Sequence, residues 1–117
     1  YRKIESVKMP ANIVSIIIES RNITECFFEF GRRGLPAEQV AEKVVEQVRH
    51  YLSAGVPVGH YLADQLLLPL ALAGHGAYVT LAPSSHAITN MSVIKAFMQI
   101  AFQSEKINHN AWKICLA

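Results

Sequence analysis

The chain has 117 residues, of which 51% are apolar and 17% are charged, a composition that excludes collagen-like, disulfide-rich and disordered chains. Its net charge of +2 gives no basis for a nucleic-acid coat or a polybasic membrane anchor. The longest uninterrupted apolar run, residues 66–73, is too short to span a bilayer, which takes roughly 20 residues.

The first third of the chain has the pattern of two strands. Residues 13–19 are apolar and rich in β-branched side chains, and residues 25–30 combine aromatic and acidic side chains, so both segments are predicted to be strands. Side chains alternate between the two faces of a strand. Phe28 and Phe30 are therefore expected on one face and Phe27 on the other, with all three in a core.

A turn and a helix follow these strands. Residues 31–34 form a glycine-flanked turn whose Arg32 and Arg33 could contact phosphate, although a solvated turn is the simpler interpretation. Residues 37–53 are predicted to be helical, with a proline just before the first turn. The apolar stripe of this helix repeats every four residues, at Val40, Val44, Val48 and Leu52.

The second half is predicted to contain two helices and three strands. In chain order they are a helix over 58–73, a strand over 78–81, a helix over 90–98, and strands over 101–107 and 111–116. Pro69 is expected to kink or break the first of these helices. Thr89 or Asn90 is expected to cap the second, with Ile88 and Val93 as a hydrophobic staple.

Charge is distributed unevenly along the chain. Residues 1–55 contain eight basic and seven acidic side chains, whereas residues 56–117 contain three basic and two acidic ones. About a quarter of residues are charged in an ordinary domain. The second half is therefore expected to pack against another domain or a symmetric partner, and the boundary is placed at residues 56–59, within an α+β fold.

The two cysteines, Cys26 and Cys115, lie far apart and form neither a CxxC pair nor a disulfide framework. The first residues, 1–4, are not followed by the apolar stretch of a signal peptide. Both observations predict a reducing, cytoplasmic setting with free thiols, and no membrane partner.

Three polar and aromatic side chains are predicted to share one face of the helix over 58–73. Tyr61, Asp64 and Gln65 are neighbours because residues three and four apart meet on a helix surface. One interpretation is a binding site in which the ring stacks on a base and the carboxylate contacts a hydroxyl or a metal. The alternative is an acid that the helix dipole favours in the first turn, with Tyr61 in the core.

His86 lies between a predicted strand and a predicted helix. The N–H groups at a helix N-terminus can hold phosphate, and their positive end disfavours a protonated imidazole. A neutral imidazole nitrogen can attack phosphorus directly. The alternative is an ordinary loop histidine. The five histidines of the chain show no zinc-binding spacing, so no metal-ligating residue is predicted.

Two segments resemble a known family. Residues 59–74, GHYLADQLLLPLALAG, and residues 83–90, PSSHAITN, are similar to the carboxy-terminal part of RNA 3′-terminal phosphate cyclases. Residues 34–38, GLPAE, match as well, and the resemblance covers about residues 10–107. It implies ATP-dependent conversion of an RNA 3′-phosphate end to a 2′,3′-cyclic phosphate, with a divalent metal, Mg²⁺ or Mn²⁺, through a covalent histidine–AMP.

The resemblance also implies roles and boundaries. It makes His86 the nucleophile. It gives the nucleotide site as Tyr61, Leu62, Ala63, Asp64 and Gln65. Residues 1–55 would be the back part of an inserted α/β domain, and residues 56–117 most of the last repeat, with two helices on a small sheet.

RNA 3′-phosphate ends and the preceding repeats of the same protein would be the partners. The chain alone is expected to be inactive. The alternatives are a non-catalytic relative that acts in ribosome assembly and an interaction module.

Overall fold

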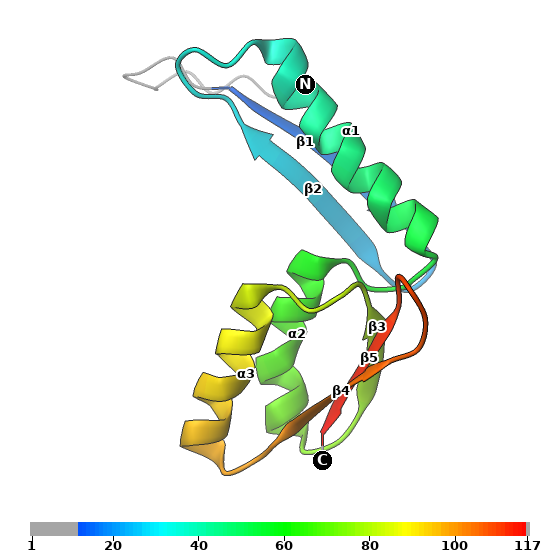
Figure 1. The fold of residues 1–117 in the computed structure, drawn as a ribbon, viewed down its shortest axis with the longest axis vertical. Coiled ribbons are helices and arrows are strands. Elements are labelled where there is room, and N and C mark those ends of the chain that lie inside the picture. Colours follow the sequence, from blue (N-terminus) through cyan, green and yellow to red (C-terminus); the bar gives the residue numbers. More distant parts are fainter. Residues whose placement is uncertain (1–11, 117) are drawn as a thin grey trace.

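Two strands and one helix form the first unit of the computed structural model, which describes residues 12–116. Strands β1 (Ile13–Glu19) and β2 (Thr24–Phe30) lie where the sequence predicted strands, and they pair antiparallel with each other. Helix α1 (Ala37–Ala54) lies along one face of this hairpin (Figure 1).

The predicted core position of the three phenylalanines is correct for only one of them. Phe27 is 1% exposed on the α1 side, whereas Phe28 is half-buried and Phe30 is 61% exposed on the other face. The alternation is therefore confirmed, but a core position is wrong for Phe30. The reason is that α1 covers a single face of the two-stranded sheet.

The apolar stripe of α1 does not stay on its buried face. Val40 and Val44 are fully buried, but Leu52 is 59% exposed and Tyr51 takes its place in the core. A spacing of four residues gains about 40° per step on a helix with 3.6 residues per turn. Three such steps turn Leu52 away from the hairpin.

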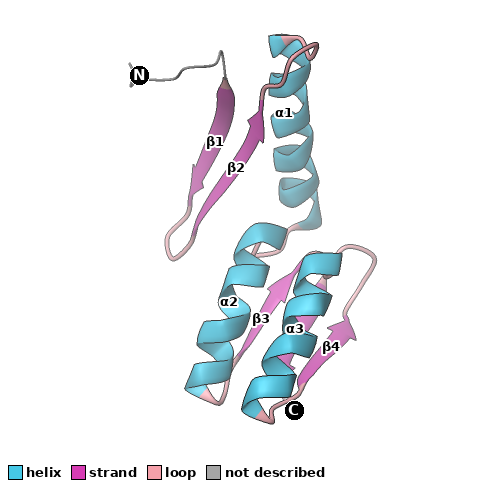
Figure 2. Cartoon of the chain, turned by 90° about the vertical axis from the view of Figure 1, so that its left-hand side faces the viewer, coloured by secondary structure: helices cyan, strands magenta, loops and turns pink. Residues whose placement is uncertain are grey.

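The second unit consists of two helices on one face of a three-stranded sheet. The sheet has the order β3-β5-β4 and is antiparallel throughout. Its strands are β3 (Ala77–Thr80), β4 (Phe102–Lys106) and β5 (Trp112–Leu116). Helices α2 (His60–Ala73) and α3 (Ser85–Met98) lie side by side on this sheet (Figures 1 and 2). The whole described chain is thus α+β, with three helices and two small sheets.

Helix α3 begins earlier than the sequence predicted. Its first residue is Ser85, and Ser84 is the N-cap, whose hydroxyl accepts a hydrogen bond from the N–H of Ala87 at 3.1 Å. The predicted staple is also wrong, because Ile88 is 56% exposed and Val93 is 48% exposed. A serine N-cap satisfies an N–H of the first turn, which explains why the helix starts there rather than near residue 90.

Helix α2 is not broken by its proline. It continues from His60 through Pro69 to Ala73, and ends at Gly74, whose N–H bonds back to the carbonyls of Leu70 and Ala71. Gly74 adopts a φ of 73°, a left-handed conformation that favours glycine.

A shared core cluster joins the two units. Phe27 and Tyr51 of the first unit pack in one cluster with Leu81 and Ala111 of the second. The Tyr51 hydroxyl also donates a hydrogen bond to the carbonyl of Pro57, 3.1 Å away, in the loop that connects α1 to α2. The shared cluster and this hydrogen bond therefore hold the two units together.

Candidate functional site

A surface cavity of about 410 Å³ lies where the amino-terminal ends of α2 and α3 meet. His60, Tyr61 and Asp64 line it from α2, and Ser84 and His86 line it from the start of α3. The two helices run in the same direction, so both amino-terminal ends point toward β2 (Figure 1). The structure thus brings together three of the residues predicted from two distant segments.

His86 is an exposed residue in the first turn of α3 rather than in the preceding loop. The Ser84 hydroxyl accepts a hydrogen bond from the N–H of Ala87, and the Ser84 carbonyl accepts one from the N–H of Ile88. The first N–H groups of a helix have no partner within it. Those nearest His86 therefore present positive partial charge at the cavity, where an anion would be stabilised.

Asp64 is held in place by a side chain of the neighbouring helix. The Asn90 amide donates to Asp64 Oδ1 at 3.0 Å and to the Asp64 carbonyl at 3.4 Å. Asn90 lies inside α3, so its predicted N-cap role is wrong. The partners are 26 positions apart, which explains why sequence spacing did not reveal this contact.

The other predicted nucleotide-site residues lie around the cavity rather than in its lining. Ala63 is 4% exposed, and its carbonyl accepts a hydrogen bond from the Tyr78 hydroxyl at 2.6 Å. Leu62 is half-buried on α2. Gln65 lines an adjoining cavity of about 490 Å³ together with Asp64 and Asn90.

Tyr78 supports α2 from the sheet below it. Burial, and next the negative charge of Asp64, raise the pKa of the Tyr78 hydroxyl above its ordinary value. The hydroxyl therefore stays protonated at neutral pH and remains a hydrogen-bond donor to Ala63. This contact fixes the first turn of α2, from which the cavity residues project.

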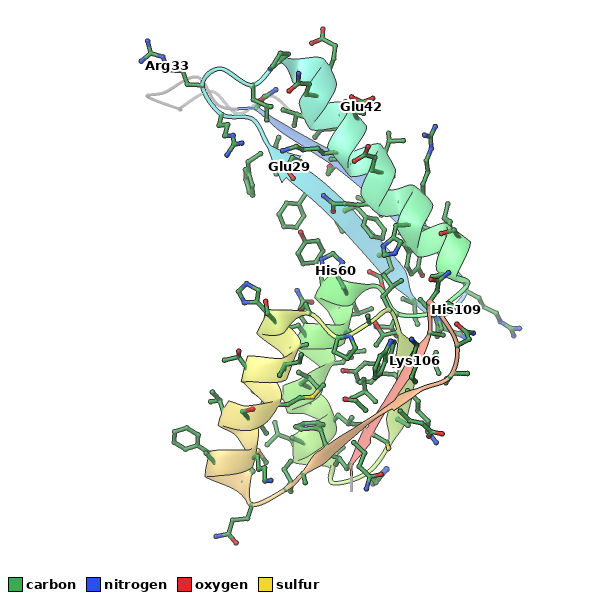
Figure 3. The ribbon with its side chains drawn as sticks, viewed as in Figure 1. Glu29, Arg33, Glu42, His60, Lys106 and His109 are labelled. Carbon is green, nitrogen blue, oxygen red and sulfur yellow. The ribbon has the colours of Figure 1, made fainter. Side chains whose placement is uncertain are left out.

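His60 is a cavity residue that sequence reasoning missed. It is the first residue of α2 (Figure 3), and its ring centroid lies 3.9 Å from that of Tyr61. Burial, followed by repulsion from His50, lowers the pKa of the His60 imidazole below its ordinary value. The only signal in the sequence was its position next to Tyr61.

An aromatic side chain of the hairpin packs against one of the cavity residues. Phe28 stacks on Tyr61 with ring centroids 5.6 Å apart and ring planes 16° from parallel. Tyr61 remains 39% exposed. The Tyr61 ring is therefore held by Phe28 and His60 and still has an exposed part.

A buried carboxylate fixes the start of α2. Glu25 of β2 is 3% exposed, and its Oε1 accepts a hydrogen bond from the N–H of Gly59, the N-cap residue of α2, at 2.6 Å. Burial raises the pKa of Glu25, and the hydrogen bond from Gly59 opposes that shift only in part. No sequence pattern predicted this contact, because Glu25 fits the alternating pattern of an ordinary strand.

The donor atoms at the cavity do not form a resident metal site. Among residues 12–116, no three His, Cys, Asp or Glu side chains are close enough to bind a metal together. Asp64 is the one carboxylate in the cavity lining. Mg²⁺ commonly binds through one or two carboxylates and substrate phosphates, so Asp64 fits a metal that arrives with a nucleotide.

None of the described helices has the length and hydropathy needed to cross a bilayer.

Comparison with known proteins gives one family. The family model of RNA 3′-terminal phosphate cyclase matches residues 3–104. The chain is 44% identical to the RNA 3′-terminal phosphate cyclase of Salmonella paratyphi C (strain RKS4594) over 97 aligned residues. These residues make up 83% of this chain. The chain spans 28% of the length of that relative.

Proposed function

The chain belongs to the RNA 3′-terminal phosphate cyclase family, and from this premise we propose that the full-length protein carrying it cyclises RNA 3′-phosphate ends. The reaction consumes ATP, needs a divalent metal, and yields a 2′,3′-cyclic phosphate. The observation that supports this proposal is the single cavity in which His86 meets Tyr61 and Asp64.

The reaction has three steps, and His86 is the nucleophile in the first. A nitrogen of its imidazole attacks the α-phosphorus of ATP, so that an N–P bond forms, the α–β P–O bond breaks and pyrophosphate leaves. An oxygen of the RNA 3′-phosphate then attacks the same phosphorus, and the N–P bond breaks. The neighbouring 2′-hydroxyl finally attacks the RNA phosphorus, loses its proton to water and displaces AMP.

The other cavity groups bind and orient the nucleotide. The amino-terminal end of α3 offsets negative charge on the α-phosphate. Tyr61 packs on the adenine, and Asp64, oriented by Asn90, accepts a hydrogen bond from the ribose or holds metal-bound water. Asp64 is the protein carboxylate that would hold a divalent metal, which would supply further charge neutralisation when bound.

We also propose that the remainder of the full-length protein covers the outer face of α2 and α3. This outer face consists of exposed apolar side chains, with Phe97 83% and Leu72 71% exposed, together with Leu68, Ile88 and Val93. The adjoining cavity that contains Gln65 is lined by three of these side chains, Leu68, Val93 and Phe97. A covering segment would therefore complete the nucleotide site, and its absence explains why we expect the 117-residue chain alone to be inactive.

A turnover assay tests the proposed function. The full-length protein is incubated with ATP, Mg²⁺ and a 5′-labelled RNA that ends in a 3′-phosphate, and a phosphatase-resistant product reports cyclisation. We expect His86→Ala to lower turnover by at least about a thousandfold, as removal of a nucleophile does. His75→Ala, which changes an exposed histidine after α2, serves as the matched control and should retain turnover. Equal turnover by His86→Ala and the control would contradict the proposal.

A further inference from the structure

A series of four aromatic rings connects the hairpin to the cavity. Phe30 meets Phe28 edge to face with centroids 5.5 Å apart, and Phe28 stacks on Tyr61 at 5.6 Å. Tyr61 in turn contacts His60 at 3.9 Å. Because Tyr61 and His60 line the cavity together with His86, the series leads from an exposed surface directly to the proposed nucleophile.

The surface at the start of this series is apolar and open. Ile13 pairs with Phe30 in the hairpin, and Ile17 follows on the same face of β1. Phe30 is 61%, Ile17 60% and Ile13 54% exposed. We call this surface, formed by Ile13, Ile17, Phe28 and Phe30, the hairpin platform. Helix α1 lies on the opposite side of the hairpin (Figure 1).

Arginines lie at both ends of the hairpin platform. Arg32 and Arg33 are exposed and follow Phe30 after a single glycine. Figure 3 shows Arg33 at the tip of the loop beyond β2, far from His60 at the start of α2. Arg21 is exposed in the turn between β1 and β2. An open aromatic ring at the end of a strand that leads into an arginine-containing loop suits a nucleic-acid strand, which offers both bases and phosphates.

We propose that the hairpin platform binds the single-stranded RNA whose 3′ end enters the cavity. A base stacks on the open face of Phe30, while Arg32 and Arg33 contact backbone phosphates. Phe28 holds Phe30 and Tyr61 in fixed relation, so the terminal nucleotide is directed toward His86. A purely apolar protein segment would gain nothing from the two arginines, and RNA therefore fits the surface better. The inference rests on the proposed function for the identity of the RNA end.

RNA binding without ATP tests the hairpin platform separately from catalysis. The full-length protein is titrated into a fluorescein-labelled, 3′-phosphorylated single-stranded RNA of about twelve nucleotides, and the Kd is read from fluorescence anisotropy. We expect Phe30→Ala and Phe30→Leu each to raise the Kd roughly tenfold, because both remove a stacking ring. Phe30→Tyr should stay within twofold of the wild type. Leu52→Ala, at an exposed apolar side chain of α1, is the control and should also stay within twofold.

The outcomes separate RNA from the alternatives. A Kd for Phe30→Ala within twofold of the wild type overturns the proposal, and so does normal binding by Phe30→Leu, which would indicate an apolar protein contact instead of base stacking. Arg33→Gln should flatten the dependence of log Kd on log salt, since one phosphate contact is lost. Formation of AMP on His86 needs no RNA. A protein that binds RNA through Phe30 but never forms that adduct would therefore refute the proposed function alone.

Discussion

Glu25 belongs to β2, yet its carboxylate caps a helix of the second unit. This carboxylate accepts a hydrogen bond from the N–H of Gly59, and Glu25 is nearly inaccessible to solvent. Gly59 leaves the space that this contact needs, since a Cβ there would lie 2.8 Å from Glu25 Oε2. The amino-terminal end of α2, with its cavity side chains, is therefore positioned by a pair of residues 34 positions apart.

The raised pKa of Glu25 makes a prediction about stability and pH. A group whose pKa is higher in the folded than in the unfolded state binds its proton more tightly when folded. Its contribution is fully present below the ordinary pKa of 4.5 and is lost as the pH rises through the raised folded value. We expect Glu25→Gln, which keeps an acceptor for Gly59, to remove this part of the pH dependence. Thermal unfolding between pH 4 and pH 8 measures it.

Two further variants check that the contact itself matters. Glu25→Ala leaves the Gly59 N–H without an acceptor and should cost about 1–3 kcal/mol of the free energy of unfolding near pH 4, where the wild-type side chain is protonated. Gly59→Ala should cost a similar amount through overpacking, about 1–3 kcal/mol. If Glu25→Gln showed the wild-type pH profile, the proposed cause of the pH dependence would be wrong.

At the scale of helices and strands, the local sequence pattern predicted several elements and their ends correctly. The runs of β-branched and aromatic side chains predicted β1 and β2, and glycine predicted the ends of α1 and α2. Two serines precede His86, and the first of them caps α3. The prediction chose Thr89 or Asn90 instead, because cap signals recur in this segment and only the folded backbone selects among them.

The part of the candidate site that lies on one face of α2 could be predicted from the sequence. Spacing put Tyr61 and Asp64 together, and the structure shows both in the lining of one cavity. Their meeting with His86 depends on the packing of α2 beside α3, which spacing does not encode. The contact from Asn90 to Asp64 and that from Glu25 to Gly59 are of the same long-range kind. No local rule identifies such partners.

For the whole molecule, the outer face of α2 and α3 is the feature that calls for a further structural element. Only five charges occur over residues 56–117, and Phe97 is 83% exposed. If the rest of the full-length protein covers this face, Phe97→Asp buries a charge and should lower the unfolding free energy by about 2 kcal/mol or more. Differential scanning calorimetry of the full-length protein measures this loss.

The matched control for this prediction is Lys95→Asp, an exposed change two residues earlier on α3. We expect it to leave the melting temperature within about 1 °C of the wild type, as surface substitutions do. Equal melting temperatures for the two variants would show that nothing covers Phe97. Loss of a dimer in size-exclusion chromatography of Phe97→Asp would assign the cover to a second copy instead.

The most direct measurement is the location of AMP on the protein. The full-length protein is incubated with ATP and Mg²⁺ in the absence of RNA, digested, and mapped by mass spectrometry. We expect one AMP bound to His86 through a phosphoramidate bond, and none in His86→Ala. Absence of any adduct, or an adduct that persists in His86→Ala, would contradict the nucleophilic role on which the proposed reaction depends.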